Sequence, residues 1–556
     1  MSNISDCRET CCGCGACAQV CPVNCISMES DAEGFLYPAV DENACISCGR
    51  CRTVCPVLRT NWENESGVTV FQEPEAYGGY IKDPDILADS SSGGAFTLFA
   101  EKIINEGGVV YGAAFDKDNT VSHTAVCDTG ELTRLRGSKY VQSDLKRVYT
   151  EIRDCLKSGK KVLFVGTPCQ TAGLKAFVGD SGNNLYLVDF ICHGVPSPGV
   201  LKAYIDSLES KEGSRVTGFR FRMKDKGWNS SGLQLGTQIS FENGTVIRNY
   251  PALKDTYMNG FLEDIVLRRS CYNCSFKTIP KYTADITIAD FWGVSKALPS
   301  IKNIKGTSLV LIHNDKGREL FDCVKENMEY SRCPDWNDSV KKNQTLLKSA
   351  NYRTERDDFF QLMHTKGYDY AAKKYFSFGR TFRNKAGRII WGKFEQVVLA
   401  VLKKVFSALK IEFTPKKQES FLQFFKFCLI GVSNACVSYL VNILTLKIIS
   451  LVAGNVPFDY VIGNIVAFIV AVYWSYCWNS RKVFNIDRSD ARFRRKVLIR
   501  TYASYAFSGL LLNNVLSTFW IQVLGVSKYV SPLLNLFITV PVNFLTNKYW
   551  AYAKER

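Results

Sequence analysis

Two short runs of cysteine constrain this chain more than any other feature of its sequence. Each run has the spacing C-x2-C-x2-C-x3-C and is followed directly by a proline, Pro22 or Pro56. This spacing is typical of proteins that hold two 4Fe–4S clusters, in which the fourth cysteine of each run binds the other cluster. The sequence therefore predicts one cluster on Cys11, Cys14, Cys17 and Cys55, and a second on Cys45, Cys48, Cys51 and Cys21.

Zinc sites and a disulfide-linked knot are the alternatives for such a cysteine-rich segment. Zinc sites more often use separate CxxC pairs than triplets closed by Cys-Pro, and a disulfide knot needs an oxidising compartment. The N-terminal residues MSNISDCRET lack the apolar stretch of a secretory signal. Since the chain has 22 cysteines, we expect its soluble part in the reducing cytosol. Cys7, Cys12 and Cys25 have no role in this assignment.

The C-terminal part of the sequence predicts a membrane domain. Apolar stretches cover roughly 424–452, 458–478, 498–524 and 530–551, and each is long enough to cross a bilayer as a helix. The loop over 481–500 is rich in Lys and Arg, whereas the other two loops hold at most one Lys. The positive-inside rule then places both termini in the cytoplasm. We expect a multi-pass inner-membrane protein whose net charge of +16 serves the membrane surface, with no nucleic-acid partner.

The two predicted helical hairpins of this tail end in similar sequences. NSRKVF at 479–484 and NKYWAY at 547–552 each read Asn-x4-aromatic with a basic residue between. Polar residues within the spans either face a bundle interior or pathway, or serve helix packing. Together with FFKFCLIGVSNA at 424–435, these features resemble the GtrA-like family of four-helix membrane proteins. The resemblance implies a role in polysaccharide or lipid-linked sugar pathways, with a polyprenyl-phosphate sugar as a partner.

Between the cysteine-rich head and the tail, short apolar runs alternate with helical stretches. This pattern predicts an α/β or α+β body. Within the basic segment before the tail, residues 389–410 suit either an amphipathic helix on the membrane surface or an ordinary linker helix. We expect a multidomain chain with a ferredoxin head over 1–58, a body in two parts over 76–150 and 151–335, a helical and basic linker over 336–420, and a four-helix transmembrane domain over 421–556.

Four cysteines of the body suggest a third cluster. The predicted strand KVLFVG is followed by Cys169, and LYLVDF is followed by Cys192. Sites in open α/β sheets form at the carboxyl ends of strands, so parallel neighbours would bring these thiols together. Cys271 and Cys274 form a CxxC pair further along the chain. There are two alternatives to a third cluster: a zinc site, which a CxxC pair also suits, and independent buried cysteines.

The body also resembles the beta-subunit family of coenzyme F420 hydrogenases and dehydrogenases. The matching stretches are SSSGGAFTLFAEKII, LRGSKYVQSDLKRVY, VLFVGTPCQTAGLK, DFICHGVPSP, CYNCSFK and ADITIADFWG. The resemblance implies an FAD-containing flavoprotein body with a 4Fe–4S cluster beside the flavin. It further implies that the ligands of this cluster are Cys169, Cys192, Cys271 and Cys274.

Local support for flavin binding comes from two short segments and two histidines. A Gly-rich turn that enters a helix binds phosphate through backbone N–H groups, although SSSGG also fits an ordinary Ser N-cap. With the resemblance, the candidate FAD contacts are Ser91, Ser92, Gly93, Gly94, Ser138, Lys139 and Tyr140. His193 and His123 are candidate proton donors near the flavin, and a structural role is the alternative for each.

These features together predict a membrane-anchored iron–sulfur flavoprotein oxidoreductase. Electrons from a ferredoxin or another low-potential donor would reach FAD and a substrate at the inner membrane face, in polysaccharide or lipid-linked sugar synthesis. One alternative is a lipid-linked sugar flippase or transport module with a redox partner domain. The other is a coenzyme F420 or ferredoxin dehydrogenase that feeds electrons to a membrane quinone.

Overall fold

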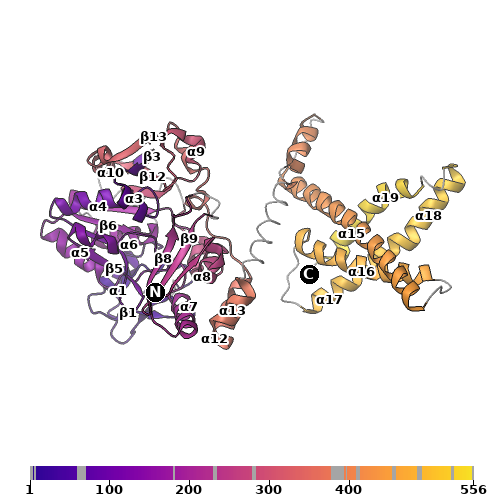
Figure 1. The fold of residues 1–556 in the computed structure, drawn as a ribbon, viewed down its shortest axis with the longest axis horizontal. Coiled ribbons are helices and arrows are strands. Elements are labelled where there is room, and N and C mark those ends of the chain that lie inside the picture. The colour runs from indigo at the N-terminus through magenta and orange to yellow at the C-terminus, as the bar shows by residue number, and fades with distance from the viewer. Residues whose placement is uncertain are drawn as a thin grey trace. The chain divides into compact units, whose positions relative to one another are not determined.

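The computed structural model divides the chain into two compact units, Met1–Asn384 and Lys385–Arg556 (Figure 1). The structure describes residues 4, 8–58, 70–179, 182–228, 234–277, 284–376, 394–395, 397–408, 414–453, 459–484, 491–526 and 531–553. Parts of the linker predicted over 336–420, including parts of the helix predicted over 389–410, lie outside the described residues. The finer domain boundaries stay predictions.

The head consists of a hairpin and two short helices around its cysteine loops. The elements are α1 (Ala16–Val20), β1 (Ile26–Ser30), β2 (Leu36–Val40) and α2 (Arg50–Thr53), with β1 and β2 antiparallel. Gly15 precedes α1 with φ 68°, and Gly49 precedes α2 with φ 72°. A left-handed conformation favours glycine because it has no Cβ. The two cysteine runs therefore fold in the same way locally, as their equal spacing suggests.

The body is built on an eight-stranded mixed sheet with the order β13-β3-β12-β11-β7-β6-β4-β5. In Figure 1 it extends from β13 at the top of the first unit to β5 in the lower half. Its strands are β3 (Val70–Ile81), β4 (Val109–Phe115), β5 (Val121–Val126), β6 (Val162–Gly166), β7 (Leu185–Phe190), β11 (Ile286–Asp290), β12 (Ser308–Asn314) and β13 (Met328–Arg332). The pairs β4–β6, β6–β7 and β7–β11 are parallel, and the others are antiparallel. The predicted α/β or α+β body is confirmed, and its sheet is mixed.

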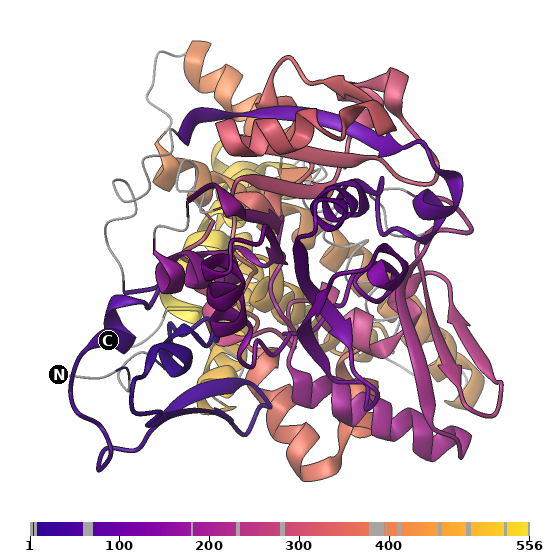
Figure 2. The ribbon, with the colours of Figure 1, turned by 90° about the vertical axis from the view of Figure 1, so that its left-hand side faces the viewer.

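Helices cover both faces of this sheet. Leu163 of β6 packs with one buried cluster, whereas Val162 and Phe164 pack with another, because successive strand residues point to opposite faces. The first cluster contains α4 (Ala95–Asn105) and α10 (Asp315–Asp322), and the second contains α5 (Val148–Lys157) and α6 (Pro168–Val178). Cys14 and Ala16 of the head join the second cluster. The head (indigo, lower left in Figure 2) therefore shares a core with the body.

A three-stranded sheet and several helices complete the first unit. The strands are β8 (Val216–Met223), β9 (Gly236–Phe241) and β10 (Val246–Asn249). The remaining helices are α3 (Pro84–Asp89), α7 (Pro198–Glu212), α8 (Thr256–Leu262), α9 (Val294–Ala297), α11 (Trp336–Val340), α12 (Glu355–Lys366) and α13 (Tyr368–Tyr375). A core between β8, β9, α7, α8, α12 and α13 also includes Phe35 and Tyr37 of the head. The head is thus held by two separate cores of the body.

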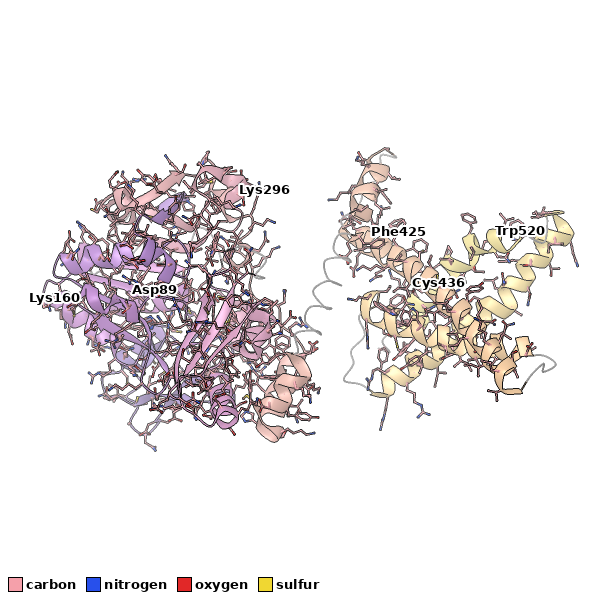
Figure 3. The ribbon with its side chains drawn as sticks, in the orientation of Figure 1. Asp89, Lys160, Lys296, Phe425, Cys436 and Trp520 are labelled. Carbon is pink, nitrogen blue, oxygen red and sulfur yellow. The ribbon has the colours of Figure 1, made fainter. Side chains whose placement is uncertain are left out.

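The second unit is helical, with α15 (Pro415–Ala453), α16 (Asp459–Lys482), α17 (Ala491–Ala506), α18 (Asn513–Thr518) and α19 (Ser531–Thr546). Figure 3 shows Cys436 on α15 and Trp520 just after α18. Among the described residues, two stretches are long and apolar enough to cross a membrane, Lys417–Val452 and Val461–Lys482. The third and fourth predicted spans fall on helical segments that π-helical turns interrupt, such as Phe507–Leu512. They stay predictions.

The two similar hairpin ends of the tail have matching local structure. The backbone N–H groups of Phe484 and Tyr552 donate to the carbonyls of Asn479 and Asn547, respectively. Both asparagines are fully buried within the second unit. The rings of Phe484 and Tyr552 stack with centroids 4.4 Å apart. The sequence repeat is therefore also a structural repeat, whose two copies meet.

Candidate redox centres

The first cysteine run lies in a tight loop against α6 of the body. Within this loop, burial and the nearby thiols of Cys11 and Cys55 raise the pKa of Cys17 to about 12. A Cβ atom on Gly173 of α6 would come within 3.0 Å of the Cys14 Sγ atom. The effect on the pKa of Cys17 indicates that Cys55, from the second run, lies beside the thiols of the first run. This is the arrangement in which a cluster takes its fourth thiolate from the other run.

In the second group of head cysteines, Cys25 connects Cys21 of the first run with Cys45 of the second. Burial raises the pKa of Cys51, and the nearby Cys45 and Cys48 raise it further. The Cys21 Sγ atom lies 3.4 Å from the Cys25 Sγ atom, and Cys25 adjoins Cys45. Among the described residues, no three His, Cys, Asp or Glu side chains converge on a single metal ion. A cubane needs no such convergence, because each thiolate binds a different iron atom.

The four body cysteines of the predicted third cluster line one cavity of about 40 Å³. Strands β6 and β7 are parallel neighbours, with Gly166 opposite Asp189, so the expected pairing is confirmed. The chain leaves β6 through a capping box of Thr167 and Gln170 and enters α6. This turn places Cys169 in the first turn of the helix. The lining thiols are Cys169, Cys192, Cys271 and Cys274.

A fifth thiol, that of Cys12 in the head, lines the same cavity. Hydrogen bonding to Cys14 and burial raise the pKa of Cys12 well above its usual range. A hydrogen bond with Cys12, together with burial, likewise raises the pKa of Cys169. Cys12 therefore lies between the cysteines of the first head run and the cavity in the body. The spacing rule gave Cys12 no role, because only the docking of head on body brings it here.

A cation and a histidine also line this cavity. The Lys277 ammonium donates to the carbonyls of Cys192 and Thr345. Burial raises the pKa of Cys192 to about 12, and the charge of Lys277 opposes this effect. His193 Nε2 lies 2.6 Å from Asp264 Oδ1, which fixes the orientation of the ring. The cavity thus offers thiol ligands, a compensating positive charge and an oriented imidazole.

The other candidate proton donor, His123, lies in a different setting on β5. Its side chain is buried, and its two ring nitrogens lie 3.0 Å from Ser143 Oγ and 3.1 Å from the Val165 carbonyl. Burial lowers its pKa to about 4. The ring stacks on Phe164 with centroids 5.1 Å apart. These contacts favour the structural role for His123.

The Ser91–Gly94 turn enters α4 without a side-chain cap. Gly94 occupies the N-cap position with φ 87° and makes no side-chain hydrogen bond. Ser91 Oγ instead accepts from the N–H and the hydroxyl of Ser138, at 2.7 and 2.9 Å. Ser92 Oγ donates to the Thr307 carbonyl. The Ser N-cap alternative is therefore wrong. The N–H groups of Gly93 and Thr97 already donate to Ser308 Oγ and to the Gly94 carbonyl, so a phosphate would bind through those of Ala95 and Phe96.

Lys224 contacts this turn, Lys139 follows Ser138, which bonds to Ser91, and Arg222 lies near Lys224. Lys224 Nζ donates to the carbonyls of Ser92 and Leu87, at 2.9 and 2.8 Å. Burial lowers the pKa of Lys224 and that of Lys139 to about 7. Arg222 pairs with Asp290 at 2.6 Å, but its buried Nε and Nη2 atoms have no partner within the described part of the chain. This excess of positive charge fits an anionic ligand.

One aromatic ring links this cationic turn to the cysteine cavity. Tyr140 packs on Phe261 with centroids 4.7 Å apart, and Phe261 meets the edge of His193 at 5.0 Å. The parallel strands β6, β7 and β11 end near Cys169, Cys192 and Asp290, respectively. Both candidate centres therefore lie at the carboxyl edge of the parallel strands, where such sheets bind ligands.

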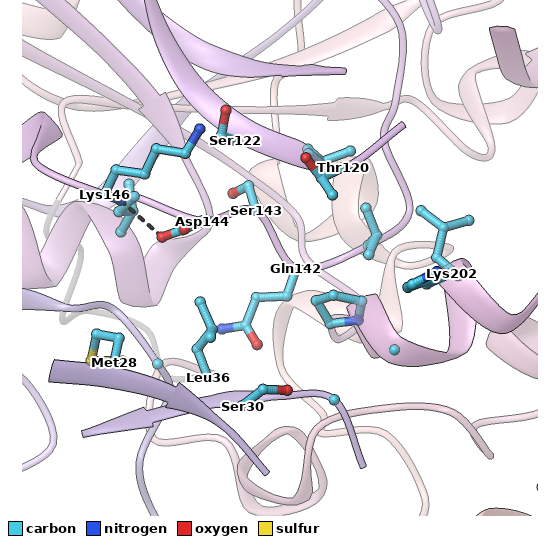
Figure 4. A pocket seen from close by; sticks show the side chains of 18 of the residues that line it. Met28, Ser30, Leu36, Thr120, Ser122, Gln142, Ser143, Asp144, Lys146 and Lys202 are labelled. Carbon is cyan, nitrogen blue, oxygen red and sulfur yellow. Dashed lines mark hydrogen bonds between the residues drawn. The ribbon is translucent and has the colours of Figure 1, made fainter. Parts of the chain in front are cut away.

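A larger cleft of about 990 Å³ lies between the head and the body. Figure 4 shows Met28, Ser30 and Leu36 of the head facing Thr120 and Ser143 of the body. Residues of the first cysteine loop, including Gly13, also line it. Solvent and small molecules thus reach the vicinity of the first head group. No sequence motif indicated this cleft, because its walls come from segments far apart in the chain.

Three family models match the chain, each over a different part. Residues 10–58 match a 4Fe–4S dicluster domain. Residues 159–334 match the C terminus of the coenzyme F420 hydrogenase/dehydrogenase beta subunit. Residues 426–552 match the GtrA/DPMS transmembrane domain. These matches confirm the dicluster head predicted from the cysteine spacing and the two family resemblances noted in the sequence.

A similar solved structure is that of a xenon-derivatised F420-reducing NiFe hydrogenase complex from Methanosarcina barkeri. One of its chains is 16% identical, with a TM-score of 0.34, and the similarity covers 52% of this chain and 92% of that chain. No curated protein matches the chain.

Proposed function

We propose that this chain, which joins a 4Fe–4S dicluster domain, a coenzyme F420 hydrogenase/dehydrogenase beta-subunit domain and a GtrA-like transmembrane domain, is a membrane-anchored iron–sulfur flavoprotein oxidoreductase. The head holds two clusters, and the body holds a third cluster and FAD. When bound, the flavin supplies the conversion between one-electron transfer and a two-electron or hydride step. The donor is a ferredoxin or another low-potential carrier.

The cavity shared by head and body is the observation that carries this proposal. Cys12 of the head and Cys169 of the body line the same cavity. The first cysteine run of the head therefore borders directly on the cysteines of the third cluster. Phe261 then connects His193 of that cavity with Tyr140 beside the cationic turn. A continuous line of contacts therefore runs from the head to the candidate FAD site.

The residues around the Ser91–Gly94 turn fit the pyrophosphate of FAD. The first turn of α4 presents backbone N–H groups, and Lys139, Lys224 and Arg222 supply positive charge. His193, held by Asp264, is placed to hold or donate a proton on the side of the cysteine cavity. We assign the substrate to the inner membrane face, in polysaccharide or lipid-linked sugar synthesis, because a GtrA-like domain is part of the same chain.

Two other functions have some support. A lipid-linked sugar transport module with a redox partner domain is supported by the buried polar residues of the second unit, such as Asn479 and Asn547. A coenzyme F420 or ferredoxin dehydrogenase that feeds a membrane quinone is supported by the match of the body. Turnover with a nucleotide or lipid-linked sugar favours our first proposal, whereas turnover with coenzyme F420 and a quinone favours the last.

We predict that FAD binding takes up protons and weakens as pH rises above about 7. Lys139 and Lys224 lose their charge near this pH in the free protein, because burial lowers the pKa of each to about 7. The pyrophosphate raises both values and recharges the lysines. The stability of the FAD-free protein has the opposite pH dependence. The unfolded chain keeps the protons on these two lysines up to about pH 10, whereas the folded chain loses them at lower pH. The free energy of unfolding therefore rises with pH in this window.

Calorimetric titration of the flavin-depleted full chain with FAD, in buffers of different ionisation enthalpy, measures this proton uptake. Lys224→Met should weaken FAD binding about tenfold or more, the value for one hydrogen bond to a charged group. Lys296→Met is the matched control, since Lys296 is an exposed lysine on α9 (Figure 3). Unchanged affinity in Lys224→Met, with no proton uptake by the parent, would contradict this FAD site.

A further inference from the structure

The side chain of Arg268 belongs to the body but makes most of its contacts with the head. It is fully buried. Its Nε atom donates to the Cys11 carbonyl at 2.8 Å, and Nη2 donates to the Leu36 carbonyl at 3.0 Å. Nη1 donates to Gln142 Oε1 at 3.0 Å, and the guanidinium lies 4.0 Å from the Tyr37 ring centroid. The contacts hold its positive charge in one fixed position.

This buried charge has no carboxylate partner. Within the described residues, no Asp or Glu oxygen lies in ion-pair range of Arg268, and the hydrogen-bond acceptors are neutral. Arg356, which is also fully buried, shows the usual solution, because both of its Nη atoms bind the carboxylate of Glu33. A buried charge without a counter-charge is strongly unfavourable. The structure therefore needs an anion beside Arg268 that is not a carboxylate.

A cluster bound by Cys11 would supply such an anion. Nη2 of Arg268 lies 3.6 Å from the Sγ atom of Cys11, a predicted ligand of this cluster. Four thiolates give a 4Fe–4S cluster a net negative charge, and reduction adds one more. We propose that Arg268 is the counter-charge of the cluster on Cys11 and raises its reduction potential. This inference rests on the head clusters of the proposed function and does not require the third cluster.

The electron balance of this step is simple. One electron from the low-potential donor enters the cluster, no covalent bond changes, and the guanidinium keeps its proton. The added negative charge is stabilised at short range by Arg268, whose own side chain is fully buried. Arg268 comes from the body and lies beside the head cluster that is nearer the body. Its positive charge favours reduction of that cluster.

Redox titration of the full chain, followed by electron paramagnetic resonance without oxygen, tests this role. Arg268→Gln should lower the reduction equilibrium constant of the first cluster at least about tenfold, which is about 59 mV for one electron. Arg269→Gln is the matched control, because it removes the same charge one position away. The Arg269 side chain is 45% exposed and pairs with Glu33 and Asp357, so its removal should leave the potential unchanged.

A second variant keeps the test decisive if Arg268→Gln fails to fold. Gln142→Glu adds a carboxylate at the 3.0 Å contact with Arg268 Nη1 and should lower the same potential without removing the guanidinium. Gln142 Nε2 also donates to the Cys12 carbonyl at 3.1 Å, so Gln142→Met, which loses this donor without adding charge, is its control. Lower potentials in both charge variants, with iron content unchanged, are the expected result. Potentials equal to the parent's in both would overturn the inference.

The iron content separates this inference from the proposed function. About eight iron atoms in the parent chain would contradict the third cluster and leave the two head clusters for this comparison. A lower reduction potential of the first head cluster in the charge variants, with about twelve iron atoms retained, would support both this inference and the proposed function.

Discussion

Replacement of Cys271 by serine should remove about four of twelve iron atoms per chain and stop electron transfer between the head and FAD. Cys271 lines the cavity that also contains Cys169, Cys192 and Cys274. A serine hydroxyl is a much poorer iron ligand than a thiolate at neutral pH, and three remaining ligands hold a cubane poorly. Iron and acid-labile sulfide analysis measures the loss. Flavin bleaching after mixing with reduced ferredoxin, without oxygen, measures the transfer.

Two matched serine variants complete this experiment. Cys333 is buried in another core and lies outside the cavity, so Cys333→Ser should keep all iron. Cys12 lines the cavity as a fifth thiol, and Cys12→Ser should also keep all iron if the four body cysteines are the ligands. Full iron in Cys271→Ser together with a loss of about four iron atoms in Cys12→Ser would show that our ligand set is wrong.

Replacement of Arg356 by alanine should lower the free energy of unfolding of the first unit by about 3–5 kcal/mol, the usual cost of breaking a buried ion pair. Arg356 lies on α12, and its Nη1 atom is 2.7 Å from Glu33 Oε1 in the head. Its Nε and Nη2 atoms donate to the Leu267 carbonyl at 3.0 Å. The alanine variant removes these donors from the Leu267 carbonyl and leaves Glu33 with its 3.1 Å contact to the half-exposed Arg269.

Chemical denaturation of the full chain in detergent, followed by the iron–sulfur absorbance, measures this change. Lys202→Ala is the control, since Lys202 and Asp206 form an exposed i,i+4 pair on α7 that should contribute at most about 0.5 kcal/mol. Equal stability of the two variants would mean that the Glu33 contact does not hold the head on the body.

The sequence predicted the parts of the candidate site that depend on local spacing. The two cysteine runs fold alike because each has its own Gly turn and short helix. The apolar runs before Cys169 and Cys192 are parallel neighbours, as expected for strands joined by a helix. Cys12, Arg268 and Phe261 were missed for a common reason. Each matters only through a contact between distant segments, and no local pattern carries such information.

The tail shows the same limit for apolar segments. Hydropathy identified its helical character, but within the described part of the tail length and composition support only the spans Lys417–Val452 and Val461–Lys482. The third predicted span follows the basic start of α17 and is broken at Phe507–Leu512. The fourth contains Pro541 within α19 and ends in another π-helical turn. Such irregularities depend on how neighbouring helices pack, which a hydropathy window does not measure.

Iron, acid-labile sulfide and flavin content per full chain, purified without oxygen, test the central claim most directly. We predict about twelve iron atoms, in three four-iron clusters, with one FAD for each chain. About eight iron atoms and no flavin would contradict the account. The head would then be a two-cluster electron carrier on a body without redox function.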